Sequence, residues 1–105
     1  MEFIETAVFT KRIVEILTDE EYRSLQEKLI QDPMAGKLIP RGKGLRKYRW
    51  AASGKGKSGG ARIIYYLYLS DDKIYMLFPY KKSDQGDLTE GQMKGLINYV
   101  KEGVL

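Results

Sequence analysis

The sequence predicts an α+β fold: a mostly antiparallel four-stranded sheet with an N-terminal helical hairpin and a C-terminal helix, in the order β-α-α-β-β-β-α. Two stretches with apolar residues at helical spacing each follow a capping box, formed by Thr18 with Glu21 and by Thr89 with Gln92. Between them, short segments rich in Tyr, Ile and Leu are separated by glycine-rich or turn-forming residues, as in strands joined by hairpins. The length of 105 residues predicts one domain over residues 1–105.

The N-terminal third contains the first strand and the helical hairpin. Residues 1–9 alternate weakly and are expected to form a strand, whereas residues 11–17 switch to helical spacing. The capping box at Thr18 starts a second helix, with Leu17 and Tyr22 placed as a hydrophobic staple. This helix ends at Asp32, because the residue before Pro33 disfavours the helical conformation. We expect the two helices to pack together on one face of the sheet.

The remaining elements follow a loop at residues 33–44, which contains several glycines. Residues 45–52, 62–69 and 74–82 have the composition of strands. The glycine-rich segment SGKGKSGG at residues 53–60 links the first two, and a tight turn at residues 70–73 joins the last two. The second capping box starts the final helix, which is expected to end near Gly103.

Positive charge is concentrated in the middle of the chain. No acidic residue occurs between Asp32 and Asp71, yet nine of the 18 lysines and arginines do, and all 14 acids lie outside this stretch. The net charge of +4 therefore divides into +9 and −5. A field of one sign attracts phosphate groups and predicts a nucleic acid as a partner. The nine residues are Lys37, Arg41, Lys43, Arg46, Lys47, Arg49, Lys55, Lys57 and Arg62.

The composition excludes several kinds of chemistry. The chain has no cysteine and no histidine, so disulfides, thiolate chemistry and the usual zinc ligands are absent, and we expect no metal or cofactor. The N-terminus is acidic and unlike a signal peptide, and the longest apolar run, residues 63–69, is too short to span a membrane. We therefore expect a cytoplasmic protein without a membrane partner.

Four cations are predicted to converge at one edge of the sheet. If the last two strands pair through the turn at residues 70–73, residues near 62 and 81 lie opposite each other. Arg62 and Lys82 then meet at the edge past which Lys55 and Lys57 run, and Tyr80 lies beside them. We therefore predict a catalytic group of Lys55, Lys57, Arg62, Lys82 and Tyr80.

Such a cluster suits the cleavage of RNA, which supplies its own nucleophile, the 2′-OH. Crowding of like charges lowers lysine pKa values and can turn one lysine into a base, while arginine remains a fixed charge. Cations also stabilise the extra negative charge of the phosphorane. RNA cleavage therefore requires neither histidine nor metal, although the sequence does not assign the acid and the base individually.

The strand at residues 45–52 adds candidates for RNA binding: Arg46, Lys47, Arg49 and Trp50. Its alternation places Arg46, Tyr48 and Trp50 on one side and Lys47 and Arg49 on the other, but neither side is cleanly apolar. Trp50 also has the character of a core residue. The sequence Gly54-Lys-Gly-Lys57 does not have the spacing of a nucleotide-binding loop and is weak evidence by itself.

The ordered set of motifs resembles the RelE superfamily of toxins from bacterial toxin–antitoxin pairs, most closely its HigB-like branch. The residues that carry the resemblance are Gly44-Leu-Arg-Lys-Tyr-Arg49, Lys55-Gly-Lys-Ser-Gly-Gly60, Arg62-Ile-Ile-Tyr65, Tyr80-Lys-Lys82 and Asp87-Leu88. The order of helices and strands also fits, so the resemblance covers nearly the whole chain.

The resemblance implies a ribosome-dependent mRNA endonuclease that leaves a 2′,3′-cyclic phosphate and is inhibited by a cognate antitoxin, expected to be a helix-turn-helix protein. By position, the family's catalytic cations match Lys55, Lys57, Arg62 and Lys82, and Arg46 and Arg49 match positions that hold RNA. Some members use a histidine or a tyrosine near the C-terminus. This chain has no histidine, and Tyr99 falls inside the last predicted helix.

Two alternatives from other classes remain open. One is a gyrase-poisoning toxin, which shares the superfold but generally lacks the full set of cations. The other is a non-catalytic RNA-binding module, which the basic stretch and its aromatic residues would also suit.

Overall fold

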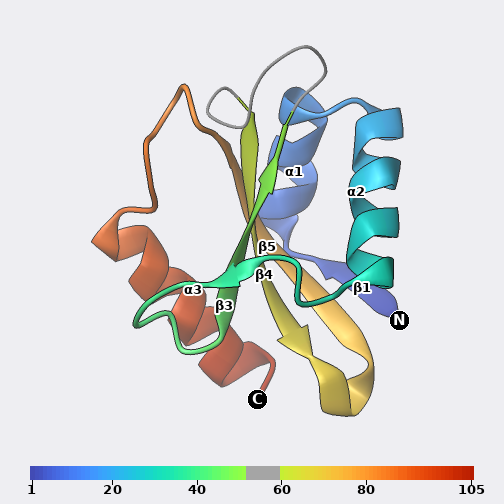
Figure 1. Ribbon diagram of the computed structural model, residues 1–105. Coiled ribbons are helices and arrows are strands. Elements are labelled where there is room, and N and C mark those ends of the chain that lie inside the picture. Colours follow the sequence, from blue (N-terminus) through green and yellow to red (C-terminus); the bar gives the residue numbers. More distant parts are fainter. Residues whose placement is uncertain (52–59) are drawn as a thin grey trace.

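Helices cover both faces of a sheet in the computed structural model, which describes residues 1–51 and 60–105. Within these residues the α-helices are α1 (Ala7–Ile16), α2 (Asp19–Gln31) and α3 (Glu90–Gly103), and a short 3₁₀ helix, Leu69–Asp71, lies at the predicted turn. The strands are β1 (Glu2–Glu5), β2 (Lys37–Leu38), β3 (Leu45–Trp50), β4 (Ala61–Tyr68) and β5 (Lys73–Lys81). Figure 1 shows α1 and α2 side by side on one face of the sheet and α3 on the other. The predicted α+β class, the helical hairpin and the C-terminal helix are confirmed.

The sheet has the order β1-β5-β4-β3-β2. The three central strands β3, β4 and β5 are antiparallel neighbours, as predicted, and β1 pairs with β5 in parallel. The prediction of four strands missed β2, which lies in the predicted loop at residues 33–44 and pairs with β3. Two residues are too few to produce a periodic pattern, so only the tertiary pairing defines this strand.

The start of α1 differs from the prediction, because β1 ends at Glu5 rather than at residue 9. Thr6 is the N-cap: its hydroxyl accepts a hydrogen bond from the Phe9 N–H at 3.0 Å and donates one to the Leu77 carbonyl at 2.8 Å. Phe9 occupies the position at which a capping box has Glu or Gln, so the sequence signal is weak here. Both predicted capping boxes, at Thr18 and Thr89, are formed.

Each face of the sheet buries its own apolar cluster. The cluster under α1 and α2 includes Phe9, Leu25, Tyr65 and Met76, and Tyr48 and Trp50 of β3 pack against it. The cluster under α3 consists of Leu45, Ile64, Leu77, Phe78, Tyr80 and Val100. Because successive strand residues point to opposite faces, one side of β3 belongs to the first cluster and the other side to the α3 face.

A β-bulge sets the register between β4 and β5. Ile64 pairs with Phe78 but Tyr65 pairs with Met76, so Leu77 is an extra residue in β5. Arg62 therefore lies opposite Tyr80, one residue from the partner near position 81 that the sequence suggested. A shift of one residue reverses the faces of a strand, so the bulge determines that Tyr80 lies on the same face as Arg62.

Candidate nucleic-acid interface

A row of three side chains crosses the central strands on the α3 side of the sheet. Arg49 of β3 lies opposite Arg62 of β4, and Arg62 lies opposite Tyr80 of β5. Directly opposed residues on neighbouring strands have Cβ atoms only about 4.5–5.5 Å apart. The structure thus brings two guanidinium groups and a phenol together, as the sequence predicted for Arg62 and Tyr80.

Arg62 and Tyr80 are shielded from solvent, with Arg62 only 4% exposed and Tyr80 fully buried. Arg62 donates a hydrogen bond from Nη1 to the Ala61 carbonyl at 3.3 Å. The Tyr80 hydroxyl has no hydrogen-bond partner among the residues that the structure describes. Burial, reinforced by the nearby Asp87 carboxylate, raises the pKa of Tyr80 to about 12. The phenol is therefore neutral at physiological pH and available as a hydrogen-bond donor.

Two lysines border this row, and both contact the loop that follows β5. The backbone N–H of Lys82 donates to the Gly60 carbonyl at 3.0 Å, which places Lys82 beside the start of β4. Its Nζ donates to the Gly86 carbonyl at 2.7 Å. Lys47 of β3 forms an ion pair with Asp87, with 3.2 Å between Nζ and Oδ1. The predicted proximity of Lys82 to Arg62 is thus present in the strand pairing.

Asp87 is a member of this site that the sequence analysis did not assign. Partial desolvation opposes its ionisation, but the Leu88 N–H, 2.8 Å from Oδ1, and the ammonium groups of Lys47 and Lys82 outweigh that effect. The pKa of the Asp87 carboxyl is therefore below its usual value, and the residue is an anion at neutral pH. The sequence analysis noted Asp87-Leu88 only as part of the family resemblance and gave Asp87 no role, since the path of the loop decides which cation it meets.

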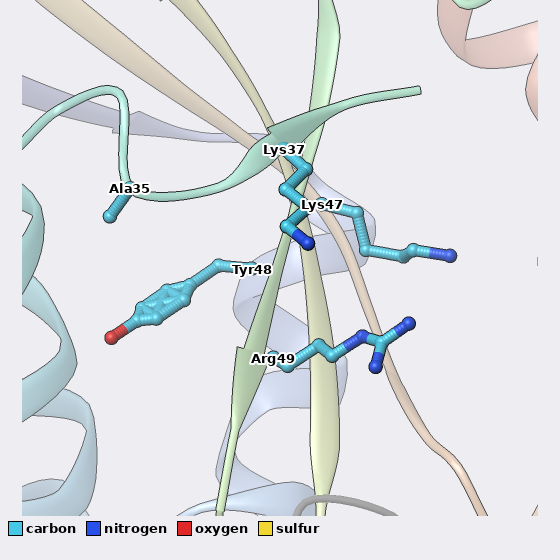
Figure 2. Close-up of a pocket in the computed structure, with 5 residues that line it drawn as sticks. All are labelled: Ala35, Lys37, Lys47, Tyr48 and Arg49. Carbon is cyan, nitrogen blue, oxygen red and sulfur yellow. The ribbon is translucent and has the colours of Figure 1, made fainter. Parts of the chain in front are cut away.

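A hollow of about 360 Å³ extends the cationic surface towards the edge of the sheet. Figure 2 shows Lys47 and Arg49 projecting from one side of β3 and the Tyr48 ring projecting from the other. Lys37 of β2, the cross-strand partner of Lys47, lines the same hollow. Lys37 was not a predicted site residue because its strand was read as a loop. Three cations from two neighbouring strands thus border one hollow.

Arg46 and Trp50 lie on the opposite face, away from this row. Arg46 donates a hydrogen bond from Nη1 to the Gly36 carbonyl at 2.8 Å and so holds the segment before β2. Trp50 packs edge-on against Tyr48, with 6.4 Å between ring centroids, at the margin of the core under α1 and α2. The structure therefore does not bring these two predicted RNA-binding residues together with Lys47 and Arg49.

Lys55 and Lys57 lie outside the described residues, so their part in the site stays a prediction. The described residues that flank them are at the same end of the sheet as Arg62, because Trp50 and Ala61 are cross-strand partners. The backbone at Gly60 passes so close to β3 that an added Cβ would be 2.0 Å from the Trp50 carbonyl oxygen. Only glycine fits at this close approach.

Arg12 of α1 is a further cation near the row that gave no signal in the sequence. Its Nε donates to the Pro79 carbonyl at 3.1 Å, and its guanidinium carbon lies 4.5 Å from the centre of the Phe78 ring. The Phe78 ring is 6.2 Å from that of Tyr80. Arg12 therefore stacks on the Phe78 ring, which in turn contacts Tyr80.

Comparison with known families identifies the class of protein to which this fold belongs. A family model described as the RelE toxin of the RelE/RelB toxin–antitoxin system matches residues 5–103. The chain belongs to this family, and its membership implies an antitoxin as partner. None of the helices in the described parts of the chain is long and apolar enough to cross a membrane.

Proposed function

We propose that this toxin is a ribosome-dependent mRNA endonuclease of the HigB-like branch that inhibits translation in the cytoplasm. The main supporting observation is the cross-strand row of Arg49, Arg62 and Tyr80 on one face of the sheet. Members of the RelE family are generally translation-inhibiting ribonucleases, which is consistent with this reading. The proposed partner is a helix-turn-helix antitoxin.

The proposed reaction is an attack of the 2′-OH of one nucleotide on the adjacent phosphate. The 2′-oxygen–phosphorus bond forms, the bond to the 5′-oxygen breaks, and the products are a 2′,3′-cyclic phosphate and a 5′-hydroxyl. A lysine of the cluster, Lys55 or Lys57, accepts the 2′-proton, and Arg62 stabilises the charge on the phosphorane. Such positioned charges each contribute about 10²–10³-fold.

Tyr80 is the proposed proton donor to the leaving 5′-oxygen. Its raised pKa keeps the phenol protonated, and its hydroxyl is unpaired among the described residues, so a substrate oxygen would satisfy it. General acid catalysis of this kind contributes about 10²–10⁴-fold. Lys82 lies at the same end of the sheet and adds positive charge near the phosphate.

The hollow beside β3 is the proposed path of the neighbouring RNA phosphates. Lys37 and Arg49 are exposed and Lys47 is partly exposed, and all three line this hollow. Since Arg62 and Tyr80 are shielded, we expect isolated toxin to cut free RNA poorly. The ribosome would supply the alignment that a mobile single strand lacks.

Primer extension on cellular messages after induction tests the proposal. Wild-type toxin should produce new 5′ ends within codons, and Arg62→Ala should abolish them while retaining its circular dichroism spectrum. Arg62→Lys serves as a second variant, since it preserves the charge at a buried position. Intact messages together with DNA damage after induction of the wild type would instead indicate a gyrase poison.

A non-catalytic RNA-binding module is the second candidate, and one observation favours it. The cations at the hollow are accessible, whereas Arg62 and Tyr80 are not. In that case wild-type toxin would bind RNA without generating new 5′ ends, on or off the ribosome.

A further inference from the structure

The loop after β5 binds the ammonium groups of Lys47 and Lys82, the two lysines that border the cross-strand row. Lys82 donates to the carbonyl of Gly86, and Lys47 pairs with the carboxylate of the next residue, Asp87. Figure 1 shows this loop running between the end of β5 and the start of α3. Two consecutive residues of one loop thus provide partners for both lysines.

We propose that Asp87 is a resident anion at the Lys47 phosphate site, and that RNA must displace it in order to bind. The inference rests on the proposed function, because it takes the cationic face to be the RNA-binding face. Asp87 would then lower the affinity of the free toxin for unaligned RNA, and would make binding depend on a substrate that is already positioned.

The geometry of Asp87 fits this exchange. Its side chain is 73% exposed and that of Lys47 is 23% exposed, so solvent and a polyanion can reach the pair. Exposed ion pairs contribute little to stability, and one carboxylate can leave Lys47 as a phosphate arrives. The Leu88 N–H also bonds to Oδ1, so the carboxylate is held against Lys47 by its own loop while the site is empty of RNA.

Asp87→Asn isolates the charge, because the amide oxygen can still accept the hydrogen bond from the Leu88 N–H. Asp84→Asn is the matched control. It makes the same change of net charge in the same loop, and the Asp84 side chain has no ion pair in the described part of the chain. A third variant, Lys47→Ala combined with Asp87→Asn, removes the cation that the substitution would release.

The measurement is the affinity for a single-stranded RNA with 2′-deoxy nucleotides at the cleavage sites, followed by fluorescence anisotropy at several salt concentrations. Asp87→Asn should bind about three- to fivefold more tightly than the wild type, or about 0.6–1 kcal/mol. The slope of log K against log salt should steepen by about 0.7, for one more phosphate contact. The added Lys47→Ala substitution should abolish this gain.

The outcomes separate the inference from the proposed function. If Asp87→Asn binds no more tightly than Asp84→Asn, or if no variant binds the RNA, the inference is wrong whatever primer extension shows. If wild-type toxin leaves messages whole while Asp87→Asn still gains affinity through Lys47, the nuclease proposal fails and the resident anion stands.

Discussion

Arginines on the two sides of strand β3 have different environments. Arg46 faces the helical hairpin and bonds to the carbonyl of Gly36, whereas Arg49, three residues later, is exposed on the α3 side opposite Arg62. Both belong to the same basic stretch of the sequence. The comparison teaches that local charge density does not reveal which cations lie together, because the face of the strand determines which of them could contact the proposed RNA.

The same contrast applies to two aromatic side chains with unpaired polar atoms. Trp50 Nε1 and the Tyr80 hydroxyl are both buried without a hydrogen-bond partner among the described residues. Trp50 packs against Tyr48 at the margin of the core under the helical hairpin, but Tyr80 lies beside Arg62. Among the described residues, Tyr80 is the one of the two that has a guanidinium group as its cross-strand neighbour.

The largest difference between the faces should appear on substitution of Arg62. We expect Arg62→Ala to lower message cleavage about 10²–10³-fold, because a buried charge opposite Tyr80 is lost. Arg62→Lys should also be impaired, since an ammonium cannot reproduce the guanidinium fork. In a reconstituted translation assay, the Arg46→Ala variant should cleave message at the wild-type rate when the rate is corrected for the fraction of folded protein. Equal losses of cleavage in Arg46→Ala and Arg62→Ala would contradict a functional difference between the two faces.

Tyr80→Phe should separate catalysis from folding. We expect cleavage to fall about 10²-fold because the proposed proton donor is lost. The free energy of unfolding should be unchanged or slightly higher, since the hydroxyl removed has no partner among the described residues. Urea denaturation and primer extension measure the two quantities, and a destabilised variant with full activity would reverse our assignment.

Arg46→Met and Arg49→Met compare the two faces at the level of stability. Loss of the Arg46 hydrogen bond to Gly36 should reduce the free energy of unfolding by about 1.5–3 kcal/mol. Arg49→Met should change it by less than about 0.5 kcal/mol, yet should weaken RNA binding and reduce its salt dependence. Urea titrations measure the free energy of unfolding, and fluorescence anisotropy measures RNA binding. Weakened RNA binding in Arg46→Met together with a loss of stability in Arg49→Met would contradict the assignment of the two faces.

The smallest expected effect is a loss of stability at alkaline pH. The folded-state pKa of Tyr80 is raised from 10.0 to about 12, so the unfolded chain releases this proton first as pH rises. The contribution of Tyr80 to the free energy of unfolding is therefore fully present below pH 10 and should decline between about pH 10 and 12. Tyr22 adds to the decline, because burial and the Glu5 carboxylate raise its pKa as well. Between about pH 9 and about pH 11, the urea midpoint of unfolding should decrease less in Tyr80→Phe than in the wild type.

Local signals in the sequence predicted much of the fold. Both capping boxes depend on residues three positions apart, and both helices begin where those residues indicate. The two-residue strand β2 and the bulge at Leu77 have no such local signal. They arise from pairing between distant segments, and the bulge alone decides whether Tyr80 faces Arg62 or the other side of the sheet.

The candidate site was predicted in part for the same reason. The closeness of Arg62 and Lys82 follows from hairpin pairing and was predicted, whereas the face on which Tyr80 lies depends on the bulge. Asp87, Lys37 and Arg12 come from a loop, an edge strand and a helix. Arg46 and Trp50 were expected to bind RNA because they share the basic stretch. Their contacts with Gly36 and Tyr48 depend on tertiary packing, which composition does not reveal.

The central claim, that the α3 side of β3 binds RNA and the hairpin side does not, can be tested by one NMR titration with the 2′-deoxy oligonucleotide. The chain has one tryptophan, so the indole N–H signal of Trp50 reports on the hairpin side and the Nε–H signal of Arg49 on the other. We predict that the Arg49 signal shifts on titration while those of Trp50 and Arg46 stay in place. Shifts of Trp50 and Arg46 with an unmoved Arg49 would contradict the account.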